Sequence, residues 1–190
     1  MHDIAANVIA AIWLGGLVFW IGASFGVKRT KFAVPRGAQW GHHLMSLSAF
    51  FLMVCPAARA GFFGWQWLPR TEACAVAGVA MLAVGMAFTL WARVCLGRNW
   101  SATVTIKEDH QLIRHGPYAI TRHPIYTGLI ASVAGTGLAL GGARHVLAVG
   151  LFAFAYWQKS RLEEQCLARE FSAEYRRYQA EVPALIPFVR

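Results

Sequence analysis

Five long apolar runs constrain what this chain can fold into. They cover roughly residues 4–27, 43–63, 72–96, 124–142 and 145–158. A helix that crosses a bilayer needs about 20 apolar residues. The first four runs meet this length, and the fifth would meet it if its helix continued into 159–170. The pattern predicts an all-α, polytopic membrane protein with about five transmembrane helices. We expect a single domain over 1–190, with N-terminal spans in 1–70 and a motif-bearing part in 96–190.

Composition agrees with a membrane protein. Of the 190 residues 57% are hydrophobic and only 14% are charged, against about a quarter charged in a soluble domain. The mean hydropathy of +0.43 points the same way. The first run resembles a signal peptide, but it is too long for one and no Lys or Arg precedes it. We therefore expect it to remain as a helix.

The net charge of +9 is distributed unevenly along the chain. Of the 18 Lys and Arg residues, only Arg59, Arg70 and Arg144 lie near the end of, or after, the second or fourth run. The remaining 15 lie at the ends of, or after, the first, third and fifth runs. This positive-inside pattern predicts an N-terminus outside, a cytoplasmic C-terminus and contact with anionic membrane lipids. Because topology accounts for the charge, we expect no nucleic-acid partner.

Neither cysteine nor histidine spacing indicates a metal site. The four cysteines contain no CxxC pair and are expected to be packed thiols, without disulfides: Cys55, Cys74, Cys95 and Cys166. His110, His115 and His123 stand in a probable loop, at spacings that are a weak pattern for zinc. We expect no bound metal.

A polar island at 107–128 separates the third and fourth apolar runs. Its ionisable and aromatic residues are His110, Arg114, His115, Tyr118, Arg122, His123 and Tyr126. Ionisable groups beside a membrane are costly and usually mark a functional site. Pro124 favours the first turn of a helix, which places Arg122 and His123 at a helix entrance. Free N–H groups and the helix dipole would there add to Arg122 as an anion site.

A second polar island, 161–188, includes the pattern of an amphipathic helix over 160–181, followed by two prolines. Five of the nine acidic residues lie in it: Glu163, Glu164, Glu170, Glu174 and Glu181. An ordinary interfacial helix would look similar. However, anionic lipids on the cytoplasmic side would repel these acids. They are therefore candidates for meeting a positive group elsewhere.

Three motifs, in order, give the chain a family resemblance. HxLxxxGPYxxxRHPxYxG begins at His110 and ends at Gly128, RxEE occupies 161–164, and FxxEYxxYxxxVPxxIPF occupies 171–188. From residue 96 onward the chain resembles the isoprenylcysteine carboxyl methyltransferases and their bacterial and archaeal relatives. Phospholipid N-methyltransferases share much of the pattern. Ser172 is a departure, because the family often has glycine there, and it puts only the local turn in question.

The resemblance implies S-adenosylmethionine as methyl donor, bound on the cytoplasmic side beneath a C-terminal helix and loop. It implies that Glu163 and Glu164 meet the positive end of this donor and that Arg122 is catalytic and serves the acceptor. The cofactor-binding residues it implies are His110, Leu112, Gly116, Tyr118, His123, Pro124, Tyr126, Glu163 and Glu164. A sulfonium and an ammonium need acidic or aromatic neighbours, and a carboxylate needs a cation. The two islands contain both kinds of group.

The leading prediction is a methyltransferase for a lipophilic acceptor, most like a prenylcysteine carboxylate. Such an acceptor needs no base, because it is already ionised, whereas the amine of a phospholipid, the second alternative, would have to lose a proton. An NADPH-dependent membrane reductase of the sterol type and a non-catalytic membrane protein are further alternatives. No GxGxxG follows a strand, so we expect no Rossmann domain for either cofactor.

Overall fold

The computed structural model describes residues 2–55, 61–66, 68–69 and 71–189. Within these ranges, five long helices follow the five apolar runs: α1 (His2–Ala23), α2 (Trp40–Val54), α3 (Glu72–Leu96), α4 (Pro124–Leu140) and α5 (Ala143–Glu181). Short 3-10 turns and strands connect them: β1 (Thr30–Ala33), η1 (Arg36–Gln39), η3 (Gly61–Gly64), η4 (Gly97–Asn99), β2 (Thr105–Lys107) and η5 (Gly116–Ala119). The second run was predicted to reach 63, but α2 ends at Val54; residues 56–60 lie outside the described ranges.

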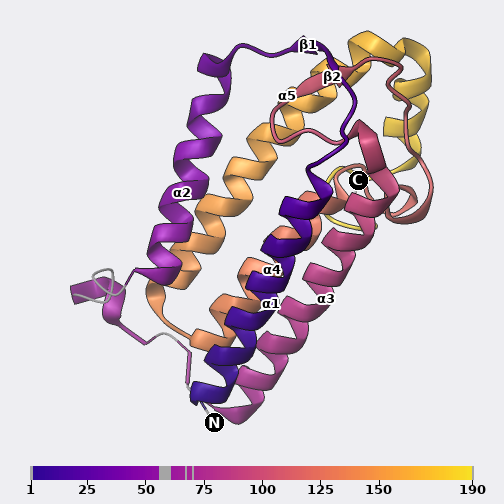
Figure 1. Ribbon diagram of the computed structural model, residues 1–190. Helices are drawn as coiled ribbons and strands as arrows, with labels where there is room; N and C mark the ends of the chain where they lie inside the picture. Colours follow the sequence, from indigo (N-terminus) through magenta and orange to yellow (C-terminus); the bar gives the residue numbers. More distant parts are fainter. Residues whose placement is uncertain (1, 56–60, 67, 70, 190) are drawn as a thin grey trace.

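Successive long helices run in opposite directions (Figure 1). The N-terminus and the α2–α3 and α4–α5 connections lie at one end of the bundle. The β1 and β2 strands, the segment 97–123 and the far end of α5 lie at the other (Figure 1). This second end, called the polar end below, therefore gathers both polar islands and the segments that carry most of the basic residues.

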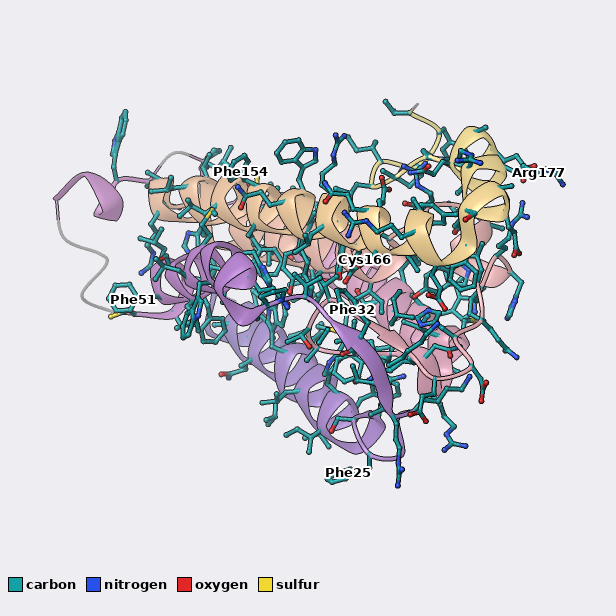
Figure 2. The ribbon with its side chains drawn as sticks, turned by 90° about the horizontal axis from the view of Figure 1, so that it is seen from above. Phe25, Phe32, Phe51, Phe154, Cys166 and Arg177 are labelled. Atoms are coloured by element: carbon teal, nitrogen blue, oxygen red, sulfur yellow. The ribbon has the colours of Figure 1, made fainter. Side chains whose placement is uncertain are left out.

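Among the described residues, two helices are long and apolar enough to cross a membrane, at Ile4–Ala23 and Glu72–Asn99, while α4 is a shorter apolar helix. Large apolar side chains are exposed around the bundle, and Figure 2 shows Phe25, Phe51 and Phe154 at its periphery. Such side chains are costly in water but favourable in lipid. The number of five spans and the sidedness of the termini stay predictions.

The fold is mostly helical, as predicted, and β1 and β2 add a small antiparallel ribbon at the polar end. Thr30 pairs with Lys107 and Ala33 with Thr105. Beyond the ribbon, the N–H of Val34 donates to the carbonyl of Val104 over 3.1 Å. The strands are three and four residues long, too short to show an alternating pattern in the sequence. The ribbon fixes the segment that becomes one wall of the site.

Helices α3 and α4 pack closely through small residues. A Cβ added to Gly128 would lie 2.5 Å from the carbonyl oxygen of Gly85, and one added to Gly78 would lie 2.5 Å from the amide nitrogen of Ala139. Gly22 and Gly26 also have small-xxx-small spacing, but added Cβ atoms there would meet nothing within 4 Å in the described structure. Contact at Gly85 and Gly128 holds the start of α4 against the middle of α3.

Helix α5 continues past residue 158, as predicted, and bends at Ser172 (φ 44°, ψ −110°). The bend turns its last part back over the polar end (Figure 1). Tyr175 and Tyr178 on this part are almost fully buried. Positive φ is costly for a residue with a Cβ, and this is the position where the resembling family often has glycine. The sequence departure therefore coincides with a strained turn.

We predict that Ser172→Gly raises the free energy of unfolding by about 1 kcal/mol, because glycine relieves the positive-φ strain at the bend. Thermal unfolding of the purified protein in detergent measures the change. Ser172→Ala, which keeps a Cβ, is the matched control and should show no gain. Equal stability of the glycine and alanine variants would contradict strain at this position.

Candidate functional site

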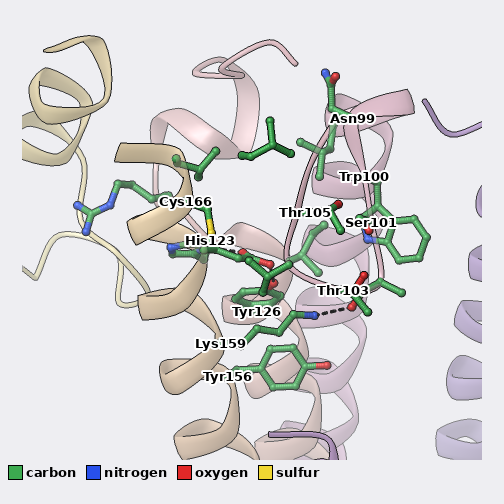
Figure 3. Close-up of a pocket in the computed structure, with 18 of the residues that line it drawn as sticks. Asn99, Trp100, Ser101, Thr103, Thr105, His123, Tyr126, Tyr156, Lys159 and Cys166 are labelled. Atoms are coloured by element: carbon green, nitrogen blue, oxygen red, sulfur yellow. Dashed lines mark hydrogen bonds and ion pairs between the residues drawn. The ribbon is translucent and has the colours of Figure 1, made fainter. Parts of the chain in front are cut away.

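A pocket of about 450 Å³ opens at the polar end of the bundle (Figure 3). Its walls come from the segment 99–106, the start of α4, the middle of α5 and Trp20 of α1. Small-molecule sites commonly measure about 300–1,000 Å³. Arg122, His123 and Glu163 line it near the polar end, and Leu129 and Tyr156 line it farther along their helices toward the bundle. The pocket thus joins a charged region to an apolar one.

His123 immediately precedes α4 and lies between two carboxylates. Its Nδ1 is 3.5 Å from Oε2 of Glu163, and its Nε2 is 3.1 Å from Oε1 of Glu164. Burial opposes the charged imidazole, but hydrogen bonds to both carboxylates outweigh burial and raise the pKa of His123. An imidazolium has a donor at each nitrogen, so the protonated ring satisfies both acids at once.

Arg122 is engaged by the protein at all three guanidinium nitrogens. Nε and Nη2 donate to Oε1 of Glu164 over 2.9 and 2.7 Å, and Nη1 donates to the carbonyls of Gln179 and Val182. Burial opposes ionisation of Glu164, but hydrogen bonds from His123 and Arg122 lower its pKa to about 2. The predicted role of Arg122 toward an acceptor stays a prediction, and it would require these bonds to exchange.

Residues 182–185, called the C-terminal strap below, cover the start of α4. The N–H groups of Arg122 and His123 donate to the carbonyls of Pro183 and Ala184 over 2.8 and 3.1 Å. Thr127 donates through its hydroxyl to the carbonyl of Leu185. The N–H groups of Arg122 and His123 are therefore already paired with the strap, and the anion site expected at this helix entrance stays a prediction.

Glu163 faces the pocket more openly than its neighbour. It lines the pocket and its side chain is 23% exposed, while that of Glu164 is 12% exposed and turned to Arg122. The hydroxyl of Tyr126 donates to Glu163. Burial opposes ionisation, but hydrogen bonding from His123 and the charge of Lys159 lower the pKa of Glu163. An ionised carboxylate therefore borders the pocket.

Aromatic rings surround this carboxylate. Tyr126 stacks on His123 with centroids 5.5 Å apart and planes at 4°, and Tyr156 lies 4.7 Å from Tyr126. His110 also lines the pocket and packs edge-on against Phe171. Carboxylate and ring faces together suit a cationic ligand group.

The wall at 99–106 contains buried polar atoms whose hydrogen bonds are unmade in the described structure. They are Oδ1 of Asn99 and Oγ1 of Thr105, and both residues line the pocket. Unpaired buried polar atoms are costly, and a functional site is one reason for them. Neither Asn99 nor Thr105 is among the site residues predicted from the sequence. An Asn directly after a long apolar run was the available signal.

The structure brings six of the predicted site residues into the pocket lining: His110, Tyr118, Arg122, His123, Tyr126 and Glu163. Leu112, Gly116, Pro124 and Glu164 are not among its lining residues. Pro124 begins α4, and Gly116 has φ 61° where a Cβ would meet Sγ of Cys95 at 3.1 Å. These two shape the backbone around the pocket, and their predicted direct contact with a cofactor stays a prediction.

Comparisons with known proteins place these features in context. A family model described as phospholipid methyltransferase matches residues 73–174, more than half of the chain. The protein-S-isoprenylcysteine O-methyltransferase of Saccharomyces cerevisiae is 34% identical over 125 residues, which cover 63% of this chain and 51% of that protein. A probable enzyme of the same name from Oryza sativa subsp. indica is 30% identical over 115 residues, covering 59% of this chain and 60% of that protein.

A solved structure is also similar. It is the eukaryotic intramembrane Ras methyltransferase, an isoprenylcysteine carboxyl methyltransferase, with a TM-score of 0.54 at 25% identity. The match covers 82% of this chain and 55% of that chain. This chain therefore spans little more than half the length of the relatives that it matches.

We predict that Arg122→Ala destabilises the protein by about 3–5 kcal/mol, because removing one partner leaves Glu164 as a buried, poorly compensated charge. Amide hydrogen exchange should show lost protection in the C-terminal strap. Arg114→Ala is the matched control, since Arg114 forms an exposed ion pair with Glu181 at the end of the same helix; its effect should stay below about 1 kcal/mol. Equal effects of the two variants would contradict a stabilising buried ion pair between Arg122 and Glu164.

Proposed function

This chain belongs to the phospholipid methyltransferase family, and from that membership we propose that it is a membrane methyltransferase that uses S-adenosylmethionine. We propose further that it methylates the carboxylate of a lipophilic acceptor of the prenylcysteine type. The observation that carries the proposal is the ionised Glu163, which borders a pocket beside aromatic rings. Names of the similar yeast and rice proteins support the acceptor class.

The pocket residues fit the proposed donor. When bound, S-adenosylmethionine supplies a methyl carbon on a sulfonium, and a carboxylate oxygen bonds to that carbon while the carbon–sulfur bond breaks and sulfur keeps the electron pair. Glu163 and the faces of Tyr126 and Tyr156 suit the positive groups of this donor. The unpaired atoms of Asn99 and Thr105 suit its amino and hydroxyl groups.

The protonation states in the pocket favour a carboxylate acceptor over an amine. His123 is held protonated between two acids. Burial lowers the pKa of His110 and favours its neutral form, but its Nδ1 already accepts from the N–H of Lys107 over 3.1 Å. That bond assigns the remaining ring proton to Nε2, which then donates. Neither ring offers a free base for an ammonium proton, and in this proposal Glu163 is engaged with the positive groups of the donor. A carboxylate acceptor needs no base.

Labelled-methyl transfer tests the acceptor. We predict transfer from S-adenosylmethionine to a farnesylated cysteine with a free carboxylate, measured as label that alkaline hydrolysis releases as methanol. A parallel assay with phosphatidylethanolamine tests the alternative, phospholipid N-methylation, because alkali does not release a methyl group from an amine. Transfer to the phospholipid alone would overturn the carboxylate proposal and keep the family assignment.

Glu163→Gln tests the donor site. We predict that it weakens S-adenosylmethionine binding by about 1.5–3 kcal/mol, the usual loss for a charge-assisted contact, because the amide removes the negative charge. Equilibrium binding to the purified protein measures the effect. Glu170→Gln is the matched control, since Glu170 lies on α5 but pairs with the exposed Lys31. Unchanged affinity in Glu163→Gln would remove this residue from the donor site.

The proposed reaction takes place on the cytoplasmic side, with five spans and the N-terminus outside. The one-sided distribution of basic residues supports this topology, and the alternating helix directions place the pocket at the basic end. We predict that reporter fusions after Arg190 and in the 141–145 connection report opposite sides of the membrane. Reporters on the same side would contradict the five-span arrangement.

A further inference from the structure

We propose that Lys159 binds the carboxylate of the acceptor and makes the pocket selective for anionic acceptors. The inference rests on the proposed function and names a residue for substrate recognition. Lys159 belongs to none of the three sequence motifs, and in sequence it reads as one of many basic residues that set membrane topology. The structure gives it a different environment, because its side chain lines the pocket and the residue is only 8% exposed.

Lys159 lies at the boundary between the charged and the apolar parts of the pocket. It precedes Glu163 by four residues on α5, which places it on the same helix face about 6 Å farther into the bundle. Figure 3 shows its side chain between the rings of Tyr126 and Tyr156, with Nζ directed at the opposite wall. Leu129 lines the same pocket on α4, farther into the bundle than His123.

The ammonium of Lys159 has capacity for another ligand. Nζ carries three N–H donors, and it donates to the carbonyl of Ala102 over 2.9 Å. It lies 5.3 and 5.8 Å from the ring centroids of Tyr126 and Tyr156. It forms none of the ion pairs found within the described residues; burial lowers the pKa of Lys159, and the carboxylate of Glu163 one turn away opposes that lowering. Burying a cation is costly unless an anion pairs with it, and ring faces offset only part of that cost.

A lipophilic acid is the anion that this position fits. Its apolar tail would occupy the lipid or the apolar part of the pocket, and its charged head would stop where polar groups begin. Lys159 is the first cation at that boundary. Arg122, the other basic residue in the lining, already donates to Glu164 and to two carbonyls. Of the two, Lys159 has more donors left for a carboxylate: one of its three N–H groups is bonded, against four of the five on Arg122.

This placement also gives selectivity a physical basis. A cationic amine at the same position would be repelled by the ammonium. The methyl ester formed from the acid carries no charge, so the product would lose the ion pair that held the substrate. The charge of Lys159 would therefore favour both binding of the acid substrate and release of the ester product.

The test measures binding rather than turnover. Full-length protein in lipid nanodiscs is saturated with S-adenosylhomocysteine and titrated with N-acetyl-S-farnesylcysteine or with its methyl ester. We expect the wild type to prefer the acid over the ester by about tenfold or more, as for a charge-assisted hydrogen bond. Lys159→Met, which keeps the length but not the charge, should bind both ligands alike, and Lys159→Arg should keep most of the preference. Lys31→Met, at an exposed lysine, is the matched control.

Two measurements separate the alternatives. S-adenosylmethionine affinity should stay within about threefold in Lys159→Met; a loss as large as that for the acid would assign the ammonium to the carboxylate of the donor and overturn the proposal. An unchanged acid preference in Lys159→Met, or no preference in the wild type, would also overturn it. If the wild type prefers the acid through Lys159 yet transfers no methyl group to it, the proposed function fails and the binding role stands. Thermal unfolding confirms that each variant is folded.

Discussion

The buried charge network around His123 is the interaction on which the polar end depends. Arg122 and His123 immediately precede α4, and Glu163 and Glu164 belong to α5. The carbonyls that accept from Arg122 belong to residues 179 and 182. The network therefore ties three segments together. The lowered pKa values of both acids contribute stability above the ordinary Glu pKa of about 4.3, and this contribution is lost as pH falls through their native values. The raised pKa of His123 contributes stability below the ordinary His pKa of about 6.5, and this stability is lost as pH rises through the native pKa of His123. The network is therefore strongest between the ordinary pKa values of Glu and His.

The network can form because backbone packing places its members first. Gly85 and Gly128 let α3 and α4 approach until an added Cβ would overlap backbone atoms, which fixes where α4 begins. The C-terminal strap then occupies the N–H groups of Arg122 and His123, which a helix start would otherwise leave unpaired. The bend at Ser172 brings the strap to this position. The conformational cost of the positive φ at Ser172 is thus offset by the hydrogen bonds of the strap and by the burial of Tyr175 and Tyr178 beyond the bend.

The sequence predicts the parts of this protein that depend on neighbours along the chain. Apolar runs locate the long helices, and Pro124 marks the first residue of α4, because span length and proline geometry are local properties. Motif spacing likewise identifies His123 and Glu163. The strands and the wall at 99–106 depend on contacts between distant segments, such as Lys159 with Ala102, which no local pattern records. Lys159 was overlooked for the same reason: its sequence neighbours indicate topology, and only the fold shows that its ammonium enters a pocket.

Adjacent acids with different surroundings show how one helix can serve both the fold and the site. A residue step turns an α-helix by about 100°, so Glu163 faces the pocket while Glu164 faces Arg122. Lys159 is one turn from Glu163 and shares its face, so a cation and an anion border the same cavity. His123 contacts both acids and thereby couples the two faces. A positive group bound at Glu163 would compete with His123 for that carboxylate and shift the imidazolium toward Glu164. Because Glu164 also accepts from Arg122, a ligand in the pocket would change the hydrogen bonds of the residues that hold the strap.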